Sequence, residues 1–81
     1  MFVETEKNLV NLDLVNEIFI KDNQIQYGYI ETRHNMILGD FSSCRDAQRA
    51  YEKLKNAMTT GEKFFSIKDC KGFVESFGWF E

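Results

Sequence analysis

The sequence contains no proline and only two cysteines among its 81 residues. Because it also lacks a run rich in glycine, serine or proline, no segment resembles a linker, and we expect one domain over residues 1–81. Cys44 and Cys70 stand in unrelated contexts, and the charged start MFVETEKN does not resemble a signal peptide. We therefore expect two reduced thiols, without a disulfide, in a small soluble cytoplasmic protein.

Metal-ligand motifs, long apolar runs and nucleotide-binding loops are also missing. His34 is the one histidine, and neither C-x-x-C nor H-x-x-x-H occurs, whereas a zinc site needs three or four ligands at suitable spacing. No apolar stretch approaches the roughly 18 residues of a membrane helix. The five glycines are scattered and form neither a P-loop nor a dinucleotide fingerprint. We expect no metal, no cofactor and no membrane association.

Neither charge nor reactive side chains favour a common enzymatic or nucleic-acid function. Thirteen acidic and ten basic residues give a net charge of −3, which is not the basic excess of a general nucleic-acid binder. Cys44, beside Arg45 at the start of a predicted helix, could act as a nucleophile with His34 as its base. A solvated turn histidine and a cysteine on a helix face explain both residues more simply. We predict that the protein is not an enzyme.

Alternating apolar and polar residues predict a series of β-strands, because side chains in a strand point to opposite faces in turn. A two-residue turn at Asp22-Asn23 would place Ile20 opposite Ile25 and Ile18 opposite Tyr27. The predicted strands are Leu9–Asp13, Val15–Lys21, Gln24–Thr32 and Met36–Phe41.

The last of these strands carries apolar residues on both faces. Regular alternation places Met36 and Leu38 on one face and Ile37 and Phe41 on the other. A sheet with one face in water shows a clean alternation of apolar and polar residues, which this strand lacks. We therefore expect both faces of the sheet to be at least partly covered.

One long helix is predicted over Ser43–Thr59. Ser43 and Asp46 have the spacing of a capping box, in which the two side chains bond each other's backbone N–H groups, and Gly61 is placed to end the helix. Apolar residues then recur at spacings of three and four, the pattern of an amphipathic helix. These residues are Cys44, Ala47, Ala50, Tyr51, Leu54, Ala57 and Met58.

For the C-terminal part we predict a short strand at about Lys63–Ser66 and then a short helix to Phe77. The helix is predicted because Cys70, Phe73, Val74 and Phe77 recur at i, i+3, i+4 and i+7. Gly72 inside that helix is unfavourable by about 1 kcal/mol relative to alanine. The predicted fold class is α+β: an antiparallel β-meander of three or four strands packed on one long α-helix, with an aromatic C-terminal strand and short helix closing the other side.

The stretch from Leu9 to Gly61 resembles a group of small orphan α+β proteins from Gram-positive bacteria and their phages. The shared features are a strand such as VNLDLVNEIFI, a strand ending in LGDF, and a capped helix such as RDAQRAYEKLKNAM. This resemblance covers about two thirds of the chain and implies the same meander and helix. It also implies that the protein comes from a phage or mobile element.

Aromatic residues make up 15% of the chain and crowd its C-terminal end. They either fold back to cover the sheet or remain exposed to anchor a partner, since aromatic side chains are enriched in interface cores. We predict a non-catalytic protein-binding domain, in its specific form an inhibitor or regulator of a host protein, that can also form a homodimer. The predicted contact residues are Phe73, Phe77, Trp79 and Phe80.

Nucleic-acid binding is the alternative function. Arg45, Arg49 and Lys53 lie at i, i+4 and i+8 on one helix face, and Tyr27 and Tyr29 could stack bases on the sheet. The competing interpretation is a solvated helix side. It would carry the ion pairs Asp46–Arg49 and Glu52–Lys55.

A substitution at Trp79 would separate the two interpretations of the aromatic residues. We expect Trp79→Ala to weaken binding to a protein partner while the far-ultraviolet circular dichroism of the helix stays nearly unchanged, because a contact residue contributes little to the fold. Loss of the helical signal in the same variant would instead place Trp79 in the core.

Overall fold

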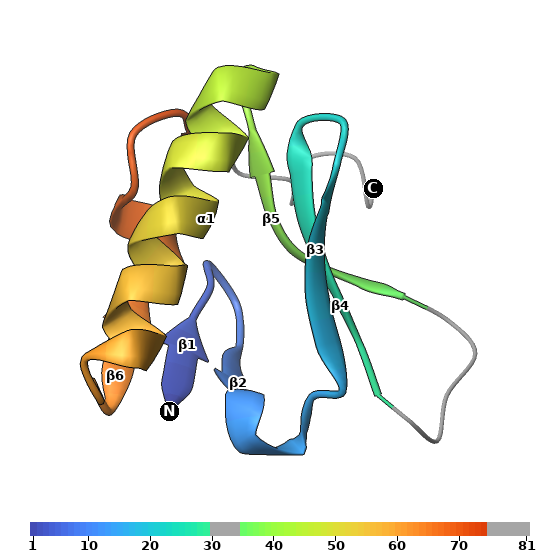
Figure 1. Cartoon of the computed structure of the whole chain (residues 1–81). Helices are drawn as coiled ribbons and strands as arrows, with labels where there is room; N and C mark the ends of the chain where they lie inside the picture. The colour runs from blue at the N-terminus through green and yellow to red at the C-terminus, as the bar shows by residue number, and fades with distance from the viewer. Residues whose placement is uncertain (30–34, 75–81) are drawn as a thin grey trace.

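The computed structural model describes residues 1–29 and 35–74 and has the predicted α+β architecture (Figure 1). Helix α1 (Cys44–Thr59) packs on a sheet whose strand order is β3-β4-β5-β7, and a second sheet has the order β2-β1-β6. The strands are β1 (Phe2–Glu4), β2 (Leu9–Asn11), β3 (Glu17–Lys21), β4 (Gln24–Gly28), β5 (Met36–Phe41), β6 (Phe64–Ser66) and β7 (Phe73–Val74), and two single 3-10 turns are η1 (Leu12–Leu14) and η2 (Ile67–Asp69).

The β3–β4 hairpin has the register that its turn predicts. Ile20 lies opposite Ile25 and Ile18 opposite Tyr27, with both strands antiparallel. Asp22, the first residue of the turn, adopts a φ of 56°, which tight hairpin turns require and which aspartate tolerates better than most residues. Strands β3, β4 and β5 follow one another as an antiparallel meander, and β7 joins antiparallel to β5 after the chain has passed through α1 and β6.

Strand β5 departs from regular alternation at a β-bulge. Ile25 lies opposite Gly39, but the neighbouring Gln26 lies opposite Ile37, so Leu38 is an extra residue without its own partner. Leu38 and Phe41 are buried, whereas 48% of Ile37 is exposed. The prediction that Ile37 and Phe41 share one face is therefore wrong, because one inserted residue reverses the alternation along the strand.

The second sheet joins the start of the chain to the segment that follows α1. Strand β1 is antiparallel to β2 and parallel to β6, with Val3 opposite both Val10 and Phe65. This pairing brings the segment after α1 back beneath the helix, where Ile67 is fully buried. The core between helix and sheets consists of Val3, Val10, Leu12, Ile25, Tyr27, Leu38, Phe41, Ala47, Ala50, Leu54 and Ile67.

Helix α1 begins at the predicted N-cap. The Ser43 hydroxyl accepts a hydrogen bond from the Asp46 backbone N–H at 3.2 Å. The Asp46 carboxylate does not complete the capping box but accepts a hydrogen bond of 2.8 Å from the Ser42 hydroxyl. The helix ends before Gly61, whose φ of 80° is the left-handed conformation typical of helix C-termini.

The C-terminal prediction holds for the strand but not for the helix. Phe64–Ser66 forms β6, but the helical segment that follows ends after the single turn η2. Gly72 has a φ of 84°, which is incompatible with an α-helix, and Phe73–Val74 then pairs with β5 as strand β7. The pairing of β7 with β5, 33 residues or so earlier in the chain, overrides the local helical pattern.

Gly72 and Gly61 form a matched pair for testing this turn. A Cβ atom at Gly72 would lie 2.6 Å from Asp46 Cβ, whereas nothing lies within 4 Å of a Cβ at Gly61. Both glycines have a positive φ, so alanine costs about 1 kcal/mol of conformational strain at either position. We expect Gly72→Ala to lower the unfolding free energy by about 1–3 kcal/mol more than Gly61→Ala, because of overpacking against the helix. Urea denaturation measures the difference, and equal losses would show that the Asp46 contact is unimportant.

Candidate functional site

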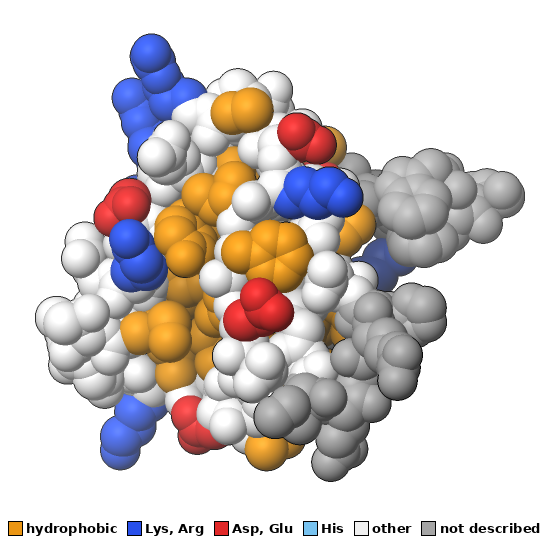
Figure 2. All heavy atoms as spheres, turned by 45° about the vertical axis from the view of Figure 1, so that its right-hand side comes forward, with side chains coloured by type: hydrophobic (Ala, Val, Ile, Leu, Met, Phe, Trp, Pro, Cys, Tyr) orange, Lys and Arg blue, Asp and Glu red, His pale blue; other side chains and the backbone are white. Residues whose placement is uncertain are grey.

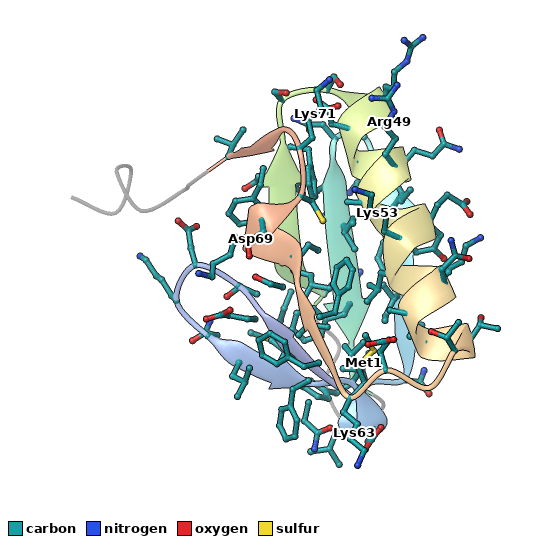
Figure 3. The ribbon with its side chains drawn as sticks, turned by 90° about the vertical axis from the view of Figure 1, so that its left-hand side faces the viewer. Met1, Arg49, Lys53, Lys63, Asp69 and Lys71 are labelled. Atoms are coloured by element: carbon teal, nitrogen blue, oxygen red, sulfur yellow. The ribbon has the colours of Figure 1, made fainter. Side chains whose placement is uncertain are left out.

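A cleft of about 420 Å³ lies between the exposed side of α1 and the turn that follows η2. Figure 3 shows labelled Arg49 and Lys53 on the helix and Lys71 on the facing turn. We call this feature the basic cleft. It is lined by Arg45, Gln48, Arg49, Ala50, Glu52, Lys53, Cys70 and Lys71.

The cleft depends on how the chain passes from η2 into β7. The Ser42 backbone N–H donates a 2.8 Å hydrogen bond to the Gly72 carbonyl, and the Ser42 hydroxyl holds the Asp46 carboxylate. Because Gly72 has no side chain, its backbone can lie directly against Asp46 in the first turn of α1. These contacts fix Cys70 and Lys71 alongside the helix.

The basic cleft has a positive net charge, whereas the whole chain has a negative one. Its lining contains four cations and one carboxylate, a net charge of +3, so the rest of a chain of net charge −3 carries −6. The carboxylate, Glu52, is paired with Lys55 at 3.2 Å, as predicted. The other predicted pair, Asp46–Arg49, is absent, since the Asp46 carboxylate bonds Ser42. Within residues 1–29 and 35–74, none of the four cleft cations forms an ion pair.

Cys70 lies half-buried in the cleft. Burial raises the pKa of its thiol, and Asp69 raises the pKa further, while Lys53 opposes both effects. Since the thiolate is the reactive form of cysteine, this environment keeps Cys70 protonated and weakly nucleophilic. Cys44, the predicted candidate nucleophile, is exposed at the start of α1, and His34 lies outside the described residues.

The structure brings together all three basic residues that the helix pattern singled out. Arg45, Arg49 and Lys53 share one face of α1 because they are spaced by about one helical turn each, and all three line the cleft. Lys71 was not identified from the sequence, because no local pattern connects it to a helix about 20 residues earlier. Only the tertiary fold places it opposite Arg49.

The predicted aromatic contact residues lie mainly beyond the part of the chain that the structure describes. Phe77, Trp79 and Phe80 fall outside the described residues. Phe73 is half-buried and packs edge-to-face on Phe41, with ring centroids 5.8 Å apart. The structure thus shows Phe73 packed against the core, and its assignment to a contact surface stays a prediction.

The sheet tyrosines do not form the predicted surface for stacking bases. Tyr27 is 4% exposed and contacts the edge of Tyr29 at a centroid distance of 5.7 Å. Burial, and then the neighbouring Tyr29, raise the pKa of the Tyr27 phenol, so it stays neutral within the core. The face of the Tyr27 ring is therefore unavailable to a nucleic-acid base.

Two further properties of the described residues bear on the type of site. No group of three or more potential metal-ligating side chains occurs in residues 1–29 and 35–74. None of the helices there has the length and apolar character needed to cross a bilayer.

Comparisons with known proteins identify no relative: no family model, no curated protein and no solved structure matches this chain.

The two cysteines allow a test of the environment in the cleft. In the folded protein we expect iodoacetamide to alkylate Cys70 more slowly than exposed Cys44, and the Cys70 rate to reach half its maximum at a higher pH than in the urea-unfolded chain. The raised pKa means that less thiolate is present at any given pH. The single-cysteine variants Cys44→Ser and Cys70→Ser separate the two rates. An unshifted pH profile for Cys70 would contradict the raised pKa.

Proposed function

We propose that the protein is a non-catalytic binding module that holds an acidic segment of a protein partner in the basic cleft. The observation that carries this proposal is the gathering of four cations, none of them ion-paired within the described part of the chain, around one cleft of an otherwise acidic molecule. A volume of about 420 Å³ is within the usual range for ligand sites and is large enough for one or two side chains.

The chemistry of the lining favours an acidic segment that also carries an apolar residue. Arg45 and Arg49 offer planar guanidinium groups, which bind carboxylates through two parallel hydrogen bonds. Between the cations, half-buried Cys70 provides apolar surface. A partner residue such as leucine or phenylalanine could contact this surface, while flanking aspartate or glutamate side chains form ion pairs with the cations of the cleft.

Nucleic-acid binding remains the second candidate because the same four cations could contact phosphates. Two observations favour a protein segment. Tyr27 is buried and cannot stack bases, and the charge of −6 outside the cleft would repel an extended polyanion. The predicted role as an inhibitor of a host protein is a specific form of the first candidate, in which the acidic segment belongs to the host protein.

Charge reversal in the cleft tests this proposal. Suitable probes are a fluorescent peptide with a leucine between glutamates, its lysine counterpart, and a single-stranded oligonucleotide. We expect the acidic peptide to bind and to shift the backbone amide NMR signals of Ala50 and Cys70. Arg49→Glu or Lys53→Glu should weaken this binding about fivefold to tenfold, since each replaces an attraction by a repulsion. Fluorescence polarisation gives the affinities.

Lys63→Glu is the matched control, because it makes the same change in charge at an exposed residue outside the cleft (Figure 3). It should change the affinity less than twofold. Equal effects of Lys63→Glu and Lys53→Glu, or no binding of the acidic peptide, would overturn the proposal. Preferential binding of the oligonucleotide, with a logarithmic salt slope of about −0.7 per phosphate contact, would instead establish the nucleic-acid candidate.

A further inference from the structure

The free edge of strand β3 is a second surface with the features of a binding site, and it is independent of the basic cleft. Within the described residues, β3 has a neighbouring strand on one side only, and it lies at the opposite end of the sheet from β7. It is also the longest edge strand there, with five residues against two or three in β2, β6 and β7.

The backbone groups of Ile18 and Ile20 point toward this free edge. In a hairpin with a two-residue turn, the residues flanking the turn bond each other, so Lys21 and Phe19 use their N–H and C=O groups toward β4. The residues between them must point the other way. The Tyr51 hydroxyl, which donates to the Ile18 carbonyl from helix α1 at 3.4 Å, agrees with this direction.

Natural proteins usually protect such an edge with proline, a bulge or an inward-pointing charge. Strand β3 reads Glu-Ile-Phe-Ile-Lys and has charges only at its two ends, on the face away from α1. Beside it lies a groove of about 240 Å³ between β3 and α1, whose lining includes Val15, Ile18, Tyr51 and Met58. Figure 2 shows hydrophobic side chains gathered on this side of the molecule, with charged side chains around them.

We infer that the occupant of this edge is the β3 strand of a second copy of the chain, paired antiparallel about a twofold axis through Phe19. In that register Ile18 lies opposite Ile20 of the second copy, and their outward-pointing N–H and C=O groups bond each other. The Ile18 carbonyl accepts this bond through its second lone pair, beside the bond that it accepts from Tyr51. Glu17 of each copy then lies opposite Lys21 of the other copy, and the two Phe19 side chains meet at the axis.

The charge pattern selects this register and orientation. Parallel pairing in register would place Glu17 beside Glu17 and Lys21 beside Lys21, whereas the twofold pairing makes both contacts attractive. The apolar residues support the same arrangement. Ile20 of the second copy would lie on the inner face next to the groove, where it would cover apolar surface of Tyr51 and Met58.

Charge exchange tests the register directly. By sedimentation between about 10 µM and 1 mM, we expect the full chain to reach twice the monomer mass. Glu17→Lys and Lys21→Glu should each weaken the dimer about tenfold, because each creates two like-charge contacts. The double variant Glu17→Lys/Lys21→Glu should restore it. A mixture of the two single variants should form heterodimers, in which every cross-strand pair is again opposite in charge.

Lys63→Glu is again the control and should leave dimerisation unchanged. Amide hydrogen exchange provides a second readout: Ile18 and Ile20 should become protected as the concentration rises, whereas Phe19, bonded to β4, should be protected throughout. A monomer at all concentrations would overturn the inference. So would a dimer that Lys21→Glu weakens no more than Lys63→Glu does, or one in which Ile18 and Ile20 stay unprotected.

Discussion

The contact between Gly72 and the first turn of α1 is the constraint on which the C-terminal half of the fold depends. Gly72 lies against Asp46, its carbonyl accepts from the Ser42 N–H, and Ser42 in turn bonds Asp46. The contact thus joins the start of the helix, the end of β5 and the start of β7. The basic cleft exists because the same contact holds Lys71 beside Arg49. Stability and the candidate function therefore depend on one glycine.

The features that could be predicted from the sequence are those decided by residues close together in the chain. The Ser43 cap, the end of α1 before Gly61 and the β3–β4 register each follow from a few neighbouring residues. The helix predicted after Ser66 also had a local basis, an i, i+3, i+4 pattern of apolar residues, but here the pattern misled. Phe73 faces the core because β7 pairs with β5 and its ring packs on Phe41, not because it belongs to a helical stripe.

Other features had little or no signal in the single sequence. Gly39 lies next to the bulge at Leu38, but a glycine within a strand is also explained by a close approach, here that of the Phe73 ring, 3.1 Å from where a Cβ would lie. The parallel pairing of β1 with β6 joins residues about 60 positions apart. The candidate site also combines residues that the sequence identified with residues that it did not. The helical spacing identified Arg45, Arg49 and Lys53, while Lys71 and the cleft itself required the tertiary structure.

The two proposed surfaces occupy opposite ends of the larger sheet, because β3 is one edge strand and β7, next to the basic cleft, is the other. A dimer joined at β3 would continue the sheet from one copy into the next and leave both clefts free at its outer ends. Two linked sites bind a partner with two acidic segments far more tightly than either site alone, provided that the spacing matches. Individual clefts on an 81-residue domain need not bind tightly in such an assembly. Pairing at β3 would therefore contribute to affinity without contacting the partner.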